Sequence, residues 1–119
     1  MRQSGWTVEV PVPADRAYAR LADFERMPEY VEGLSSVRRV GGDVLRIDGD
    51  SGRWEWRITQ AMPGRSLVLE PLDAAGPALR IALAPGTVMT AVTVRVSQPE
   101  DGPPLRPHRE RLMGFLSSD

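Results

Sequence analysis

The sequence predicts an α+β domain in which a curved antiparallel sheet closes on a short C-terminal helix. Seven segments have strand-like sequence, and tight-turn residues separate most of them. The segment Leu105 to Leu116 follows these strands with amphipathic helical spacing, and Pro107 suits its first turn. The residues expected to share one face of this helix are His108, Leu112, Phe115 and Leu116. We expect the helix to cover the apolar face of the sheet and to leave an apolar space where a small molecule binds.

Length and hydrophobic content predict a single domain spanning residues 1–119. The chain has 119 residues, of which 41% are hydrophobic, and this length leaves no room for a second domain. No apolar run approaches the roughly 20 residues of a membrane-spanning helix. The first six residues lack the apolar core of a signal peptide. We therefore expect a soluble, cytoplasmic protein without a membrane span.

The charge balance and the missing residue types exclude several kinds of chemistry. Fifteen Arg and sixteen acidic residues give a net charge of -1, which argues against nucleic acid as a partner. The chain contains no Cys and no Lys, so disulfides, thiolate nucleophiles and lysine Schiff bases are excluded. One His cannot form a His-rich metal site, and the acidic segment Asp48 to Gly52 lacks a third oxygen residue and the closing Glu of a calcium loop. We expect a polar hairpin turn there, with no metal and no cofactor.

The N-terminal part is predicted to contain one strand and two short helices. Residues Trp6 to Val12 alternate valines with polar side chains, as a half-buried strand does. Ala14 to Asp23 has helical spacing of its apolar residues. Met27 to Val31 is expected to form a second helix, because Pro28 is tolerated in a first helical turn but not in a helix interior.

Six further strands are predicted after this region. Gly41-Gly42 is typical of a two-residue hairpin, and the segments Met62 to Arg65 and Ala84 to Thr87 both place Pro and then Gly as a type II turn requires. The expected strands are Ser36 to Val40, Val44 to Asp48, Arg53 to Thr59, Ser66 to Leu72, Ala78 to Ala84 and Val88 to Ser97.

Several local motifs resemble a known family. The motifs are the stretch from Val10 to Val31, Ser36-Val37-Arg38, Trp56-Arg57-Ile58-Thr59, Pro63-Gly64-Arg65-Ser66-Leu67 and Gly86-Thr87 before a valine-rich strand. They are similar to landmarks of the polyketide cyclase/dehydrase branch of the START-like (SRPBCC) superfamily, over nearly the whole chain. The resemblance implies a helix-grip fold, a seven-stranded antiparallel sheet with β-α-α-β6-α order wrapped on the C-terminal helix. Members include aromatase/cyclases, lipid and quinone carriers, and hormone receptors.

The C-terminal helix is shorter here than is usual in that family. About 12 residues give a helix of roughly 18 Å, whereas a final strand of about ten residues spans roughly 33 Å. The helix therefore cannot cover the sheet alone. Either the cavity is shallow and open at one end, or a second subunit covers the remaining apolar surface, and we predict a homodimer.

Aromatic side chains are the main candidates for ligand contact. The residues expected on the inner face of the sheet are Trp54, Trp56, Ile58, Leu79, Ile81, Leu83, Val88, Val92 and Val94. Most of them are explained as core, and the predicted ligand-binding set is Tyr18, Tyr30, Trp54, Trp56, Ile58, Thr90, Leu112 and Phe115. Trp54, Trp56 and Tyr30 offer flat surfaces with a polar atom, which suit a planar polycyclic or quinone-like molecule. Thr90 is expected either to orient a ligand carbonyl or to bond locally within its strand.

His108 is the candidate catalytic residue, because its ordinary pKa lies near neutrality and it occupies the presumed inner face of the last helix. The alternative is an exposed His in a first helical turn. Glu55 and Arg57 alternate with the tryptophans and should face outward beside Arg46, unless a bulge reverses the register and buries them.

Three classes of function follow from this interpretation. The first is a cofactor-independent cyclase or dehydratase acting on a polyketide-like substrate, where folding the chain into one conformer matters more than proton transfer. The second is a non-catalytic carrier or sensor of an apolar or aromatic small molecule, such as a lipid or a quinone. The third is a protein-interaction module that uses the uncovered sheet.

Overall fold

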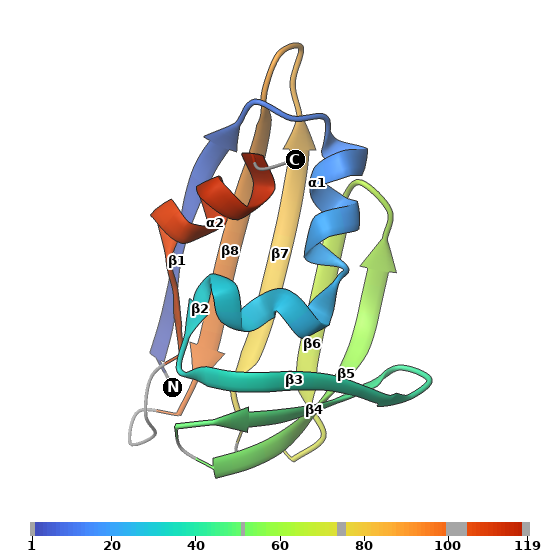
Figure 1. The fold of residues 1–119 in the computed structure, drawn as a ribbon, viewed down its shortest axis with the longest axis vertical. Coiled ribbons are helices and arrows are strands. Elements are labelled where there is room, and N and C mark those ends of the chain that lie inside the picture. The colour runs from blue at the N-terminus through green and yellow to red at the C-terminus, as the bar shows by residue number, and fades with distance from the viewer. Residues whose placement is uncertain (1, 51, 74–75, 100–104, 118–119) are drawn as a thin grey trace.

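A seven-stranded antiparallel sheet forms the body of the protein. The computed structural model describes residues 2–50, 52–73, 76–99 and 105–117. Neighbouring strands are antiparallel and follow the order β1-β8-β7-β6-β5-β4-β3. The strands are β1 (Arg2–Val10), β3 (Leu34–Gly41), β4 (Val44–Gly49), β5 (Gly52–Met62), β6 (Ser66–Pro71), β7 (Ala78–Pro85) and β8 (Thr90–Gln98). Together with a C-terminal helix, this sheet confirms the predicted α+β, helix-grip class (Figure 1).

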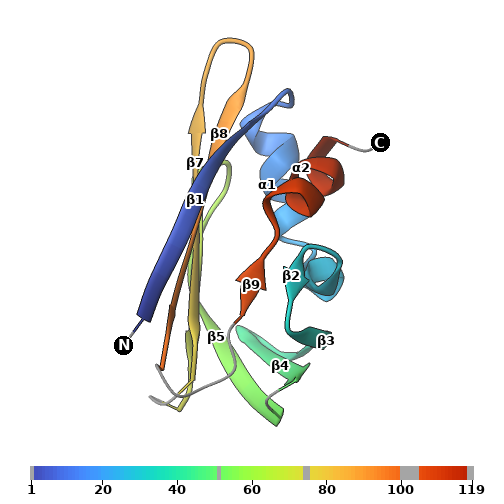
Figure 2. The ribbon, with the colours of Figure 1, turned by 90° about the vertical axis from the view of Figure 1, so that its left-hand side faces the viewer.

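Three helical segments lie on one side of the sheet, which we call the inner face. Helix α1 spans Ala14–Leu21, the 3-10 helix η1 spans Phe24–Glu29, and α2 spans Arg109–Ser117. A two-stranded ribbon, β2 (Val31–Glu32) paired with β9 (Arg106–Pro107), connects the end of η1 to the start of α2. Figure 2 shows these segments on one side of β1, β7 and β8, whose other side is the outer face. None of the helices in the described ranges has the length and apolar character needed to cross a membrane.

The first strand and the second helix differ from prediction at their boundaries. Strand β1 ends at Val10, two residues earlier than expected, because Pro11 and Pro13 have no N–H to donate to a neighbouring strand. The second helix begins at Phe24 and ends at Glu29, with Pro28 inside it. It does not reach Val31, since that residue pairs with β9 instead.

The C-terminal helix begins later than predicted. Arg106 and Pro107 belong to β9, so the prediction that Pro107 opens the helix is wrong. The nine residues of α2 measure about 14 Å, and α1 and η1 cover further parts of the inner face. Leu21, Phe24 and Met27 are all buried there. This burial within one chain removes the reason for which a second subunit was expected, and the homodimer stays a prediction.

The inner face has the predicted alternation except at one end. Six of the predicted core positions are buried: Trp56, Leu79, Ile81, Leu83, Val92 and Val94. Val88, by contrast, is 80% exposed, because β8 begins only at Thr90. The preceding loop is closed by a hydrogen bond of 2.8 Å from Gly86 N–H to Met89 O. The predicted type II turn is therefore wrong here, since Gly86 lacks the positive φ that Gly64 has (74°) in the other Pro-Gly turn.

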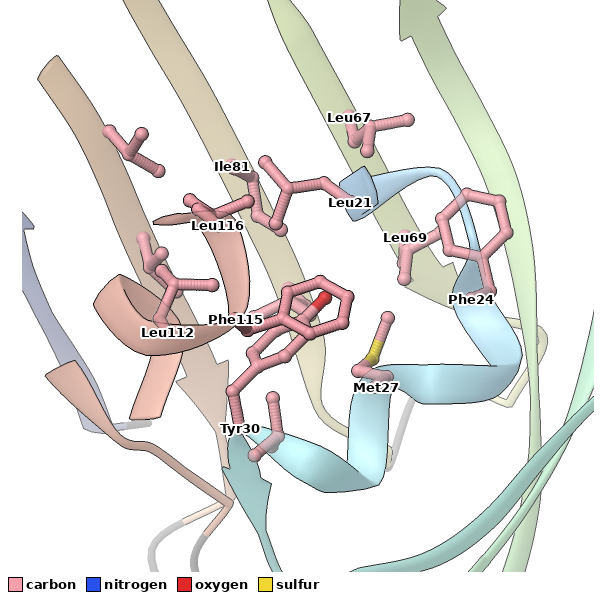
Figure 3. Packing of buried hydrophobic residues seen from close by; sticks show 14 of the residues in the cluster. Leu21, Phe24, Met27, Tyr30, Leu67, Leu69, Ile81, Leu112, Phe115 and Leu116 are labelled. Carbon is pink, nitrogen blue, oxygen red and sulfur yellow. The ribbon is translucent and has the colours of Figure 1, made fainter. Parts of the chain in front are cut away.

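Side chains fill the space between the helices and the inner face. Leu112 and Leu116 of α2 and Leu21 of α1 are fully buried. Figure 3 shows them facing Leu67, Leu69 and Ile81 from the sheet, with Met27 and Phe24 of η1 alongside. These described side chains of the chain itself therefore occupy the predicted apolar region.

Candidate functional site

Tyr30 is the buried polar residue at the centre of the candidate site. It caps the C-terminal end of η1, is 1% exposed, and its ring lies 5.0 Å from the Phe115 ring at an interplanar angle of 36°. Figure 3 shows its hydroxyl oxygen inside the hydrophobic cluster, beside Phe115. Among the described residues, this hydroxyl has no hydrogen-bond partner. A buried polar group left without a partner costs about 1–3 kcal/mol, so a ligand that accepts its hydrogen bond would recover this cost.

The surroundings of Tyr30 keep its phenol protonated. Burial raises the pKa of Tyr30, and the negative charges of Asp23 and Glu29 raise it further. The hydroxyl is therefore a hydrogen-bond donor at neutral pH and not a base. On the Phe115 ring, the Arg26 guanidinium lies 4.8 Å from the centroid, and Arg26 Nε donates to Glu29 at 2.7 Å. The aromatic pair of Tyr30 and Phe115 is thus in contact with a cation at the molecular surface.

The two candidate tryptophans have different environments. Trp56 is fully buried, and its Nε1 donates to the Pro77 carbonyl at 2.7 Å. Trp54 is half-buried and meets Trp56 edge-on, with ring centroids 5.8 Å apart and planes at 76°. The buried Nε1 of Trp54 has no partner among the described residues. Trp54 also lines a surface groove of about 400 Å³ with Arg46 and Leu72, so it is accessible to a ligand in a way that Trp56 is not.

The other predicted ligand contacts are mainly parts of the core. Leu112 and Phe115 are buried on α2, while Tyr18 and Ile58 are half-buried against the core cluster. Thr90 is 2% exposed, and its hydroxyl donates to the Val12 carbonyl at 2.6 Å. This bond joins residues 78 positions apart, so it is not the bonding within the strand that was expected as the alternative to ligand contact. It anchors the segment after β1 onto β8.

His108 does not face the core. Its side chain is 44% exposed, and its Nε2 lies 3.1 Å from Oε2 of Glu32 on β2. Its backbone N–H donates to the Tyr30 carbonyl at 2.7 Å. The expected inward orientation is wrong because the β2–β9 ribbon delays the start of α2 and leaves His108 before it. In the described part of the chain, no hydrogen bond or ring contact joins His108 to the candidate tryptophans Trp54 and Trp56. A catalytic role for His108 stays a prediction.

Glu55 and Arg57 face outward, as predicted. Glu55 pairs with Arg46 across β4 and β5, where the two side chains are 41% and 54% exposed and Oε2 lies 3.7 Å from Nη2. The register shift in β5 falls between Ile58 and Gln60, after both tryptophans, so it does not reverse their faces. An ion pair this exposed contributes at most about 1 kcal/mol.

Sequence reasoning missed some residues that shape the site. Glu32 contacts the His108 ring through a side-chain hydrogen bond, and the Arg26 guanidinium lies over the Phe115 ring. Trp6 donates a hydrogen bond from Nε1 to the Pro107 carbonyl at 3.3 Å. The spacing of Arg26 and Glu29, three residues apart, indicated their ion pair. The contacts of Glu32 and Trp6 join residues 76 and 101 positions apart, and no local pattern indicates such pairs.

Comparisons with known proteins agree on the fold. Residues 4–114 match the family described as polyketide cyclase / dehydrase and lipid transport. A Deinococcus radiodurans protein has a TM-score of 0.75 at 22% identity, covering 98% of this chain and 92% of its own. The Zhui aromatase/cyclase from Streptomyces sp. R1128 has a TM-score of 0.65 at 17% identity, with coverage of 97% and 81%. A START superfamily protein from Mycobacterium smegmatis has a TM-score of 0.64 at 16% identity, with coverage of 95% and 85%. No curated protein matches the sequence.

The family match spans nearly all of the sheet and ends within α2. Its extent agrees with the helix-grip arrangement of strands around that helix. The chain therefore belongs to the polyketide cyclase/dehydrase and lipid transport family.

Proposed function

We propose that this protein binds a flat, mostly apolar molecule that carries a carbonyl oxygen, such as a quinone or an aromatic polyketide. The molecule lies between η1 and α2 and accepts a hydrogen bond from Tyr30. The observation that carries this proposal is the Tyr30 hydroxyl, which is buried among apolar side chains without a partner in the described part of the chain. Family membership supports it at the level of an apolar ligand.

The arrangement favours binding over proton-transfer chemistry. Burial raises the pKa of Tyr30, so its phenol is a weak acid at neutral pH and cannot accept a proton from a substrate. The exposed His108 ring lies beside Glu32, outside the core cluster. The site as described therefore has a buried donor to hold a carbonyl, whereas the neighbouring carboxylates of Asp23 and Glu29 are exposed and Glu29 is paired with Arg26.

A cyclase or dehydratase is the second candidate function. The family description and the similarity to an aromatase/cyclase favour it. In such a reaction, Tyr30 would polarise a ketone by hydrogen bonding, and the site would act mainly by holding a reactive chain in one conformer. Turnover of a polyketone by the wild-type protein, lost in Tyr30→Phe, would support this candidate.

The binding proposal is tested with a matched pair of ligands and one conservative variant. We measure binding of 1,4-naphthoquinone and of naphthalene by tryptophan fluorescence and by thermal shift. The absence of Cys means that no thiolate competes by reacting with the quinone. In Tyr30→Phe, we expect naphthoquinone affinity to fall about 3- to 10-fold through loss of one hydrogen bond, while naphthalene affinity stays unchanged.

Other outcomes contradict the proposal. If Tyr30→Phe lost affinity equally for naphthoquinone and naphthalene, Tyr30 would act by its shape and not by hydrogen bonding through its hydroxyl. The absence of saturable binding by quinones, aromatic polyketides and fatty acids would favour the protein-interaction module instead. His108→Ala is the control variant, and we expect it to bind naphthoquinone as the wild type does.

A further inference from the structure

A second candidate site lies on the outer face of the sheet, on the side opposite the helices. The register places Gly5 of β1 opposite Arg95 of β8, and Arg95 opposite Arg80 of β7. In the next row, Thr7 lies opposite Thr93, and their hydroxyl oxygens are 2.9 Å apart. A groove of about 480 Å³ opens over these two rows, and we call it the arginine groove.

Gly5 is what opens the groove on the β1 side. A Cβ at this position would lie 2.6 Å from the Val94 carbonyl oxygen and 3.0 Å from Cγ of Arg95. Because Gly5 has no side chain, the outer surface beside Arg95 is left uncovered by β1. Glycine inside a strand weakens it and often marks a place where another group approaches closely, which is consistent with a ligand at this position.

The two arginines form an unusual pair. Like charges directly opposite each other on neighbouring strands destabilise a sheet. The described residues supply no acidic group within ion-pair distance of either Arg80 or Arg95. No carboxylate lines the groove, and Glu70 is a diagonal neighbour of Arg80 on β6, two residues beyond Val68. Two arginines that are direct cross-strand neighbours thus line one groove without a counter-charge from the described chain.

We propose that the arginine groove binds the phosphoryl group of a small organic molecule. A phosphoryl dianion neutralises both guanidinium groups, whereas a single carboxylate neutralises one. Each arginine can donate two parallel hydrogen bonds to phosphate oxygens. In the next row, Thr7 and Thr93 share one hydrogen bond between their hydroxyls, which leaves one O–H of the pair as a further donor. The volume exceeds that of a phosphoryl group, and the remainder accommodates the organic part of the ligand.

The proposal is tested by NMR titration of the full chain with inorganic phosphate at about pH 8, where phosphate is mainly a dianion. Sodium chloride keeps the ionic strength constant, and acetate is the matched monovalent anion. We expect saturable shifts of the Gly5, Arg80 and Arg95 amides with phosphate and much weaker ones with acetate. Arg80→Gln and Arg95→Gln are each expected to weaken phosphate binding at least tenfold.

Two control variants separate this site from general charge effects. Arg57→Gln removes the same charge from the outer face of β5, opposite Glu70, and is expected to keep full phosphate affinity. Arg95→Lys keeps the charge but loses the planar fork, and should lose most of the affinity. In low salt without phosphate, Arg80→Gln and Arg95→Gln should raise the melting temperature, because each removes a like-charge contact.

Several results would overturn the proposal. Amide shifts that rise linearly with phosphate without saturating would mean that the groove holds no site. Equal affinities in wild type, Arg80→Gln and Arg95→Gln would place any bound phosphate elsewhere. A lowered melting temperature in both glutamine variants would mean that the arginines serve the stability of the sheet. Because ligand binding at Tyr30 is measured separately, these outcomes leave the proposed function intact.

Discussion

At the scale of single residues, a few buried polar atoms distinguish this interior from a purely apolar core. Trp56 and Thr90 satisfy their donors on backbone carbonyls, so both are explained by structure alone. Tyr30 and Trp54 each keep a buried donor without a partner among the described residues. Sequence reasoning chose the same aromatic residues for their flat surfaces, but it could not separate the satisfied donors from the unsatisfied ones.

Removing the Tyr30 hydroxyl should not destabilise the ligand-free protein. Tyr30→Phe deletes a buried group that has no described partner, so we expect the free energy of unfolding to stay equal or to rise by about 1 kcal/mol. Urea denaturation measures this change. A loss of more than about 1 kcal/mol would mean that the hydroxyl is bonded in solution.

Removing the Thr90 hydroxyl should have the opposite effect. Thr90→Val keeps the side-chain shape but leaves the Val12 carbonyl without its donor, and we expect a loss of about 1–3 kcal/mol in urea denaturation. Thr7→Val is the control, since its hydroxyl bond is exposed and should matter by less than about 0.5 kcal/mol. Similar losses of unfolding free energy in Thr90→Val and Thr7→Val would contradict the expectation that the buried hydroxyl bond contributes more than the exposed one.

At the scale of elements, the residue at which helix α2 begins decides whether His108 lies in the core. The β2–β9 ribbon delays the start of α2 and places His108 outside the core. Its contact with Glu32 is about half exposed on both sides and is worth at most about 1 kcal/mol. The position of His108 therefore follows from strand pairing and not from helical periodicity.

Helix α2 contains a position where glycine is not required. A Cβ at Gly114 would meet no atom within 4 Å, and its φ is not positive. Gly114→Ala should therefore raise the free energy of unfolding by about 0.5–1 kcal/mol through a smaller entropy loss. Gly5→Ala is the matched control, and it should destabilise because its Cβ would clash with the Val94 carbonyl. Thermal denaturation of both variants checks this contrast.

At the scale of the whole molecule, the composition gives an unusually simple titration at alkaline pH. The chain has no Lys, no Cys and two Tyr, and its arginines stay charged to above about pH 12. Burial raises the pKa of Tyr30 in the folded state, so above about pH 10 the unfolded chain releases a proton that the folded chain retains. The contribution of Tyr30 to the free energy of unfolding is therefore fully present below about pH 10 and is lost as the pH rises beyond it.

The alkaline loss of stability should depend on Tyr30. We expect unfolding free energies from urea titrations to fall by up to about 1.4 kcal/mol per pH unit above about pH 10. Tyr30→Phe should remove much of this slope, whereas Tyr18→Phe serves as the control for the other tyrosine. An unchanged slope in Tyr30→Phe would mean that Tyr30 reaches solvent in the folded protein.

The homodimer predicted from the short C-terminal helix also belongs to this scale. Sedimentation velocity over a range of protein concentrations measures the oligomeric state directly. A single monomer boundary at every concentration would contradict the dimer and would agree with burial of the inner face by α1, η1 and α2.

The sequence by itself determined the fold class, the order of the seven strands of the main sheet and of the three helical segments, and the alternation of Trp54, Glu55 and Trp56. It did not indicate the β2–β9 ribbon. These features depend on local periodicity and turn residues, which act over a few positions. Only the tertiary structure decided that His108 faces Glu32, that Tyr30 lacks a partner in the described chain, and that Arg80, Arg95 and Gly5 lie in one row. Those facts depend on strand register and packing between distant segments, which single stretches of sequence do not encode.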